Sequence, residues 1–295
     1  MALTSGNSAS HPLSLTALDT YAFEALLKRV ARSFQLSLRI LPSSIRPTLS
    51  LAYMLARASD TIADASSAPG FQRLALLRRL PGSFPEKCPE LGLEGDEEEL
   101  LKLLPRLLDI LKTLPDREEI EHAWGIILQG QMFDLERFAM ADSSAPPPAL
   151  TPAELEEYTY LVAGSVGEFW TRICFRHLPD YASLRIDEML PLAKRFGQGL
   201  QLVNILRDRR GDADSGRVYI PDERFYNEMR HVEELLQSGD IYAAAVRRRA
   251  PRAACRLPLD LARQTLALVA EHPLGGRVKV SRHKVWLACF KALWP

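Results

Sequence analysis

The chain has 295 residues, a formal net charge of +0 and a sequence pI of about 7.0. This length suits one large domain or two small ones, and the balanced charge argues against a surface that binds nucleic acid. The four cysteines have no C-x-x-C spacing, so they indicate reduced thiols in a cytoplasmic protein rather than a zinc site or a disulfide framework.

The first residues are small and polar, and they lack the basic and apolar regions of a signal peptide. No apolar run reaches the roughly 18 residues needed to cross a bilayer. Helical periodicity dominates the remaining chain, and no segment of useful length has the period of a strand. We therefore expect residues 1–14 to be a disordered tail and residues 15–295 to be a single all-α domain.

The first two predicted helices cover about 15–39 and 45–64, and the second carries the acidic pair Asp60 and Asp64. Apolar residues precede and surround this pair, which therefore sits on a mostly buried helix. Like charges at positions i and i+4 repel each other, and near a core they need a compensating cation. Arg57, three residues before Asp60, is one such cation.

The middle of the chain predicts further helices over 71–80, 96–104, 107–114 and 117–140, with Pro105 interrupting the region around it. We interpret the acidic run at 96–99 as the charge preference of a helix N-terminus rather than a metal site. Three polar residues of the 117–140 helix lie among apolar neighbours. One or more of Gln129, Gln131 and Asp134 could face a cavity, but we favour a position on the solvated face of the helix.

Thr151, Pro152 and Glu154 predict the start of a helix that runs to about Phe175. This helix carries Tyr158 and then a run of small residues that includes Ala163 and Gly164. Glycine costs about 1 kcal/mol against alanine in a helix interior, so the glycines of this run make sense if something passes close to the backbone there. Tight helix–helix packing and the floor of a tunnel for an apolar substrate both fit this pattern.

A second acidic pair ends the helix predicted from Leu184 to about Arg209, where Asn204, Asp208 and Asp212 recur every four residues. We expect Gly211 and the following D-A-D-S-G run to break the helical pattern. Either acidic pair alone fits a solvated helix face. If the two helices face each other, however, four carboxylates meet across a cavity that suits two or three Mg²⁺ ions and a diphosphate leaving group.

The last third of the chain predicts more helices, with breaks at 238–239, 257–258 and 273–276. It ends in the basic and apolar stretch V-K-V-S-R-H-K-V-W-L-A-C-F-K-A-L-W-P. An amphipathic helix that closes the domain has this composition, and so does a helix that makes peripheral contact with a membrane.

Four of these segments together resemble the squalene/phytoene synthases, which are trans head-to-head prenyltransferases. The segments are S-F at 33–34, Y-x-x-x-R-x-x-D-x-x-x-D at 53–64, Y-T-Y-L-V-A-G-S-V-G at 158–167, and Q-L-x-N-I-L-R-D-x-x-x-D…G-R-x-Y-x-P at 201–221. The resemblance covers about residues 30–221 and implies an isoprenoid-synthase-type helical bundle around a central cavity.

The resemblance also implies a reaction and a set of residue roles. Two farnesyl diphosphates would condense to presqualene diphosphate, which NADPH would then reduce to squalene. Tyr158 would remove a proton or stabilise a cation in the first step. The metal ligands would be Asp60, Asp64, Asn204, Asp208 and Asp212. The substrate-binding residues would be Arg32, Ser33, Phe34, Tyr53, Arg57, Ala163, Gly164, Gln201, Asn204 and Arg217. Lys279 and Arg282 are the candidates for NADPH binding.

Other products remain open, namely dehydrosqualene, hydroxysqualene and phytoene. The first acidic motif, R-A-S-D-T-I-A-D, resembles squalene synthases more than the other types. One departure is Gly211, where related enzymes usually carry an acidic residue. A catalytically silent helical assembly factor is a further alternative, but it would have no chemical need for four intact aspartates.

Overall fold

The computed structural model describes residues 20–31, 34–65, 67–80, 84, 90–139 and 147–272. Arg32, Ser33, Lys279 and Arg282 lie outside these ranges, as does the basic stretch at the C-terminus. Within them the regular elements are α1 (Thr20–Ala31), α2 (Phe34–Arg39), α3 (Arg46–Asp64), α4 (Gly70–Arg79), α5 (Gly95–Leu111), α6 (Arg117–Asp134), η2 (Leu135–Ala139), α7 (Pro152–Thr159), η3 (Tyr160–Gly164), α8 (Ser165–His177), α9 (Ile186–Asp214), η4 (Asp222–Arg224), α10 (Phe225–Ala245) and α11 (Arg249–Glu271). No strand occurs among the described residues, which confirms the all-α prediction.

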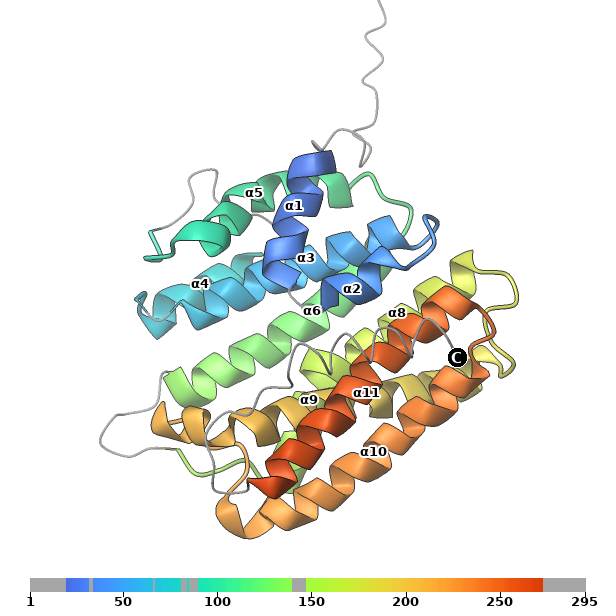
Figure 1. Cartoon of the computed structure of the whole chain (residues 1–295). Helices are drawn as coiled ribbons and strands as arrows, with labels where there is room; N and C mark the ends of the chain where they lie inside the picture. The colour runs from blue at the N-terminus through green and yellow to red at the C-terminus, as the bar shows by residue number, and fades with distance from the viewer. Residues whose placement is uncertain are drawn as a thin grey trace, which may run out of the picture.

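Two groups of helices meet along α6 (Figure 1). In one group α3 packs against α4 and α5; in the other α9 packs against α8, α10 and α11. Helix α6 contacts α3 on one side and η3 and α8 on the other, so it joins the two groups. The helices of the two acidic pairs, α3 and α9, therefore belong to different halves of the bundle.

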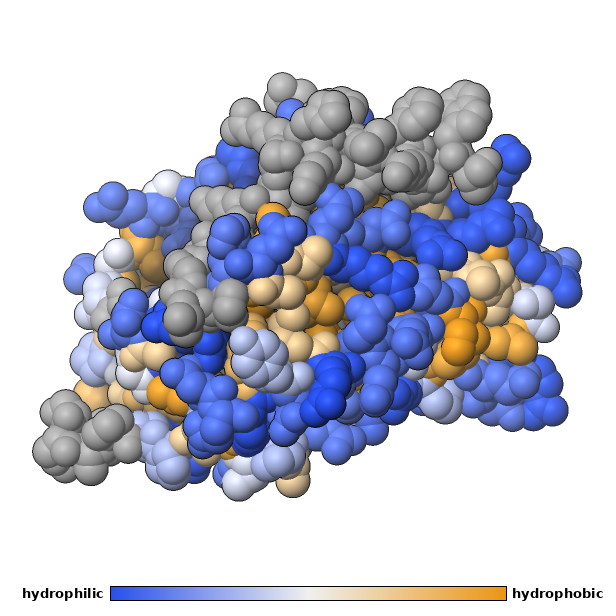
Figure 2. All heavy atoms as spheres, turned by 60° about the horizontal axis from the view of Figure 1, so that its bottom comes forward, coloured by the Kyte–Doolittle hydropathy of each residue, from blue (hydrophilic) through white to orange (hydrophobic). Residues whose placement is uncertain are grey.

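Hydrophilic residues cover most of the face seen in Figure 2, with smaller hydrophobic patches between them. The large hydrophobic side chains exposed in the described part of the chain are Phe71, Ile186, Tyr226 and Ile241. No helix among the described residues is long and apolar enough to cross a membrane.

Several predicted helix breaks are wrong because side-chain packing overrides local propensity. Helix α5 runs through Pro105, with leucines 100, 101, 104 and 107 fully buried on either side. Helix α11 likewise continues through Pro258. Gly239 lies inside α10, where a Cβ atom would come within 2.5 Å of the Phe196 ring. This glycine makes room for a neighbouring side chain and does not end the helix.

The segment predicted as one helix from 151 to 175 is two α-helices joined by the wide turn η3. It begins as predicted, because Thr151 and Glu154 form a reciprocal capping box and Pro152 occupies the first turn. The wide turn η3 contains Ala163 and Gly164. Single π-type turns inside helices are rare and frequently occur at functional sites.

Helix α9 extends past the predicted end at Arg209 to Asp214, so Gly211 does not break it. The chain turns away just beyond the helix at Gly216, whose φ of 78° is accessible to glycine at little cost. The turn brings the Arg217 backbone N–H to 2.8 Å from the Asp212 carbonyl oxygen. Asp208 and Asp212 therefore share one helical face, and the chain returns towards that face at Arg217.

Candidate active site

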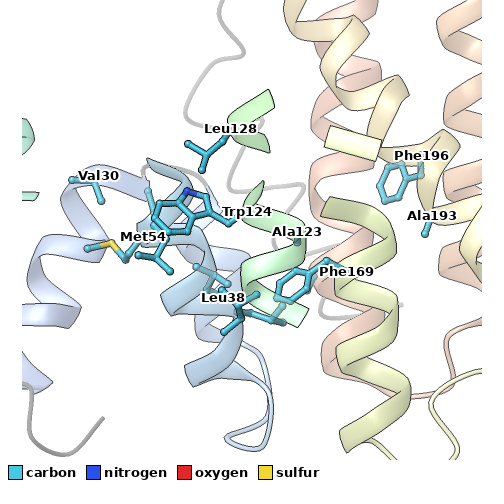
Figure 3. Close-up of a cluster of buried hydrophobic side chains, with 14 of the residues drawn as sticks. Val30, Leu38, Met54, Ala123, Trp124, Leu128, Phe169, Ala193 and Phe196 are labelled. Carbon is cyan, nitrogen blue, oxygen red and sulfur yellow. The ribbon is translucent and has the colours of Figure 1, made fainter. Parts of the chain in front are cut away.

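A cavity of about 1040 Å³ lies inside the bundle and collects most of the predicted site residues. Its polar lining consists of Arg57, Asp60, Asp64, Gln131, Asp134, Gln201, Asn204, Asp208, Asp212 and Arg217. The rest of the wall is largely apolar or aromatic. Figure 3 shows part of this wall, where Leu38, Trp124 and Phe169 contribute side chains from different helices. One cavity therefore combines a carboxylate-rich region with an apolar interior.

The first acidic pair lies at the end of α3 together with Arg57. The Arg57 guanidinium forms an ion pair with Asp60 and lies 3.1 Å from a carboxylate oxygen of Glu97. Burial and the negative charge of Asp64 raise the pKa of Asp60 to about 6, although Arg57 opposes this shift. The pair thus has negative charge that Arg57 neutralises incompletely, as a cation-binding position requires.

The second acidic pair faces the same cavity from α9. The Nε atom of Arg207 donates to Asp208 at 3.0 Å, and Nη2 of Arg217 lies 3.5 Å from Asp212. Asn204 and Gln201 lie one turn earlier, with their side-chain amides 3.5 Å apart. The four-residue spacing in the sequence therefore places these oxygen donors along one face of the helix, as predicted.

Arg217 connects the two acidic pairs. Its Nη1 atom lies 3.8 Å from Asp64 and 3.9 Å from Asp134, and its Nη2 atom lies 3.5 Å from Asp212. These carboxylates come from α3, α6 and α9. A single guanidinium group thus balances part of the charge of three helices that the sequence separates by up to 148 positions, from Asp64 to Asp212.

Asp134 is the site residue that the sequence reasoning missed. It lines the cavity from the last turn of α6, together with Gln131, so the prediction of a solvated face is wrong for these two side chains. Gln129 is exposed, in agreement with that prediction. Asp134 accepts a hydrogen bond from the Tyr219 hydroxyl, and burial raises its pKa to about 6. The spacing of three residues from Gln131 to Asp134 was the available signal, because it puts both on one helical face.

Tyr158 lies in an aromatic cluster beside these carboxylates. It is buried, and its ring stacks on that of Tyr219 with centroids 5.3 Å apart and an interplanar angle of 22°. The Phe133 ring lies 5.9 Å from Tyr158 on another side. Burial first, and then the charge of Asp134, raise the pKa of Tyr158 well above its ordinary value. The phenol is therefore protonated at neutral pH.

The small residues of η3 and α8 divide between cavity lining and close helix packing. Ala163 and Gly167 line the cavity, and Tyr53 lines it from α3 while its hydroxyl donates to the Val30 carbonyl at 3.4 Å. Gly164 is buried elsewhere, because a Cβ atom there would meet Gln198 and Tyr160 at 3.1 Å. Gly164 therefore serves helix packing instead of lining the cavity. Phe34 begins α2, and Arg32 and Ser33 lie outside the described residues.

The donor set fits a hard divalent cation. All of the proposed ligands line one cavity and carry side-chain oxygen atoms, and burial, followed by the charge of Asp64, raises the pKa of Asp60. Within the described ranges, no three Asp, Glu, His or Cys side chains converge on one point. This arrangement suits an ion such as Mg²⁺, which usually takes one or two carboxylates and completes its shell with water and substrate phosphates.

The profile of the squalene/phytoene synthase family matches residues 27–238. A bifunctional lycopene cyclase/phytoene synthase of Colletotrichum graminicola is 30% identical over 228 residues, which are 72% of this chain and 36% of that protein. A Botryococcus squalene synthase from Botryococcus braunii is 27% identical over 67% of this chain and 42% of its own length. The chain thus spans about a third of the length of the bifunctional relatives.

A solved structure of TcSQS with the ligand E5700 superposes with a TM-score of 0.78. The two chains are 21% identical, and the match covers 94% of this chain and 86% of that one. At this identity the likeness establishes the fold, while the match over residues 27–238 establishes the relationship. The chain belongs to the squalene/phytoene synthase family.

Proposed function

We propose that this protein catalyses the Mg²⁺-dependent head-to-head condensation of two farnesyl diphosphates to presqualene diphosphate. NADPH, for which Lys279 and Arg282 are the candidate binding residues, would supply the hydride that converts this intermediate to squalene. The main support for the proposal is that two acidic helices and two arginines, Arg57 and Arg217, line the same large and mostly apolar cavity. At about 1040 Å³ its volume is at the upper end of the range for small-molecule sites, roughly 300–1,000 Å³. This volume supports the binding of two substrate molecules instead of one.

The polar end of the cavity is suited to the departure of a diphosphate group. Bound Mg²⁺ would supply the positive charge that neutralises the leaving group, held by Asp60, Asp64, Asn204, Asp208 and Asp212. Arg57 and Arg217 both sit at the cavity wall, where their guanidinium groups can turn from carboxylate partners to phosphate oxygens. Guanidinium groups bind phosphate in a bidentate manner, which would orient the leaving group.

The apolar wall protects the allylic cation that ionisation produces. Trp124, Phe169 and Ala163 help to exclude water, which would otherwise capture the cation as an alcohol. Aromatic faces such as those of Tyr158 and Tyr53 stabilise positive charge by cation–π interaction. Tyr158 is also the group proposed to receive the proton that is lost when the cyclopropane ring closes.

The hydride step rests on the family resemblance. Its two candidate residues, Lys279 and Arg282, lie outside the described residues. The D-T sequence of the first acidic motif supports squalene formation, whereas the 30% identity to a bifunctional lycopene cyclase/phytoene synthase supports a phytoene-type reaction without a hydride. A phytoene or dehydrosqualene synthase is therefore the second candidate function.

The metal assignment is tested by Asp60→Asn and Asp208→Asn, with pyrophosphate release from farnesyl diphosphate and Mg²⁺ as the readout. Each variant should lose at least about a hundredfold in turnover, because removing one electrostatic stabiliser costs roughly 10²–10³. Asp96→Asn is the control, since Asp96 is half exposed and pairs with Arg29 on the surface. Turnover of either site variant within a few-fold of wild type would refute the assignment.

A further inference from the structure

The proton lost in the first condensation needs a final acceptor, and Tyr158 is poorly suited to keep it. A buried phenol whose pKa lies well above its ordinary value is already protonated at neutral pH. It can take a second proton only while its own proton leaves on the other side. The environment of the Tyr158 hydroxyl therefore determines whether it can act as a base.

Tyr158, Tyr219 and Asp134 form a chain of contacts at the cavity wall. The Tyr219 ring stacks on Tyr158, and a hydrogen bond between the two side chains contributes to the electrostatics of both. Tyr219 has one O–H group, and it donates that group to Oδ1 of Asp134. Because this O–H group is given to Asp134, the Tyr219 oxygen can accept a proton from the Tyr158 hydroxyl, which is the orientation that a relay towards Asp134 needs.

Asp134 has the properties of a terminal acceptor. It is a carboxylate with 19% of its side-chain surface exposed, so a proton that it takes up can later leave through the cavity. Its pKa of about 6 lies near neutral pH, where a proton acceptor works best. The charged and titratable groups that face it are Arg217, Tyr219, Tyr158, Asp64 and Asp212. Its direct partners, Tyr219 and Arg217, are not among the proposed metal ligands.

We propose that Tyr219 and Asp134 form a proton relay that carries the proton of the first half-reaction away from Tyr158. The proposal rests on the function proposed above. A substrate C–H bond breaks, and its electron pair forms the closing C–C bond of the cyclopropane. The proton passes to the Tyr158 oxygen, the original Tyr158 proton passes to Tyr219, and the original Tyr219 proton passes to Asp134. Both tyrosines end neutral, and Asp134 ends as a carboxylic acid.

A competing role for Asp134 is to position Arg217, whose Nη1 atom lies 3.9 Å away. The two roles make different predictions. A relay serves the step that releases a proton, which is the formation of the cyclopropyl intermediate. Positioning of a diphosphate-binding arginine would serve both ionisations, so its loss would slow the conversion of supplied presqualene diphosphate as well.

The test uses Asp134→Asn, Tyr219→Phe and the double variant in single-turnover assays on the full chain with Mg²⁺. One assay starts from farnesyl diphosphate and the other from presqualene diphosphate with NADPH. The relay predicts a loss of roughly 10²–10³-fold in the first assay and less than about threefold in the second, within the range for proton transfer by side chains. Because both changes break one path, the double variant should be no slower than the slower single variant.

Asp134→Glu keeps a carboxylate and should recover part of the first half-reaction. Tyr219→Phe keeps the stacked ring, so its loss of rate cannot be ascribed to a missing side chain; far-UV circular dichroism verifies folding. Equal losses in both assays, or multiplying losses in the double variant, would overturn the relay. If wild-type protein forms no presqualene diphosphate, the proposed function fails and the relay fails with it. If wild type forms it and the variants lose both steps equally, only the relay fails.

Discussion

Gly197→Ala tests whether close contact between α9 and η3 shapes the cavity. A Cβ atom at this position would lie 2.3 Å from the Ala163 carbonyl oxygen and 2.8 Å from its carbonyl carbon. Both atoms are backbone, so they cannot rotate away as a side chain would. Ordinary contact begins at 3.4 Å, and the two helices must therefore separate by about 1 Å.

The size of the effect follows from two opposing terms. Overpacking of this kind costs typically about 1–3 kcal/mol, and the upper end applies here because backbone must move. Alanine gains about 1 kcal/mol over glycine in a helix interior. The net loss is about 2 kcal/mol, which corresponds to a fall in Tm of roughly 3 °C for a chain of 295 residues.

Thermal unfolding followed by circular dichroism measures this change, with Gly125→Ala as the matched control. Gly125 lies inside α6, and no atom outside its own helix backbone lies within 4 Å of the place that an added methyl group would take, so its substitution should raise Tm by roughly 1.5 °C. Gly197→Ala should also lower turnover, because Ala163 lines the cavity. A Gly197→Ala protein as stable as the control would refute the packing argument.

Three further predictions concern the polar end of the cavity. Gly211→Ala should stabilise α9 by about 1 kcal/mol, since nothing lies within 4 Å of the added methyl group; a lower Tm would contradict this. Glu97→Gln should raise KM for farnesyl diphosphate several-fold with little change in kcat, because a Glu97 carboxylate oxygen lies 3.1 Å from the Arg57 guanidinium and helps to position it. An unchanged KM would show that Arg57 needs no such support. Asp134→Asn should raise stability without Mg²⁺ at pH 8 more than at pH 5, by at most about 1.5 kcal/mol. The folded protein holds the pKa of Asp134 at about 6, above the ordinary 3.8, so ionisation of Asp134 destabilises the folded state as pH rises between these two values, and the loss is complete above pH 6. Equal effects of the substitution at the two pH values would refute this.

The acidic pairs were predictable from the sequence because their geometry is local. A spacing of four residues fixes a shared helical face whatever the tertiary structure is. That the two faces line one cavity depends on how α3 and α9 pack around α6, and the sequence supported this only through the family resemblance. The capping box at Thr151 was predictable for the same local reason.

The errors occur where tertiary contacts outweigh local signals. Pro105 and Gly239 are helix breakers by propensity, but buried leucines and the Phe196 ring hold their helices intact. Gly164 and Gly167 are indistinguishable as small residues in one run, and only the packing of α9 decides that Gly167 lines the cavity. Asp134 was missed because a lone carboxylate on a helix is most often solvated. Its role depends on Tyr219, which lies 85 residues away in the sequence.

The central claim is head-to-head condensation of prenyl diphosphates, and identification of the products tests it most directly. The protein is incubated with Mg²⁺ and either farnesyl or geranylgeranyl diphosphate, with and without NADPH. We predict presqualene diphosphate from farnesyl diphosphate alone and squalene once NADPH is added. Dehydrosqualene or phytoene regardless of NADPH would replace the squalene assignment and keep the condensation. Recovery of both substrates unchanged, or of simple hydrolysis products only, would contradict the claim itself.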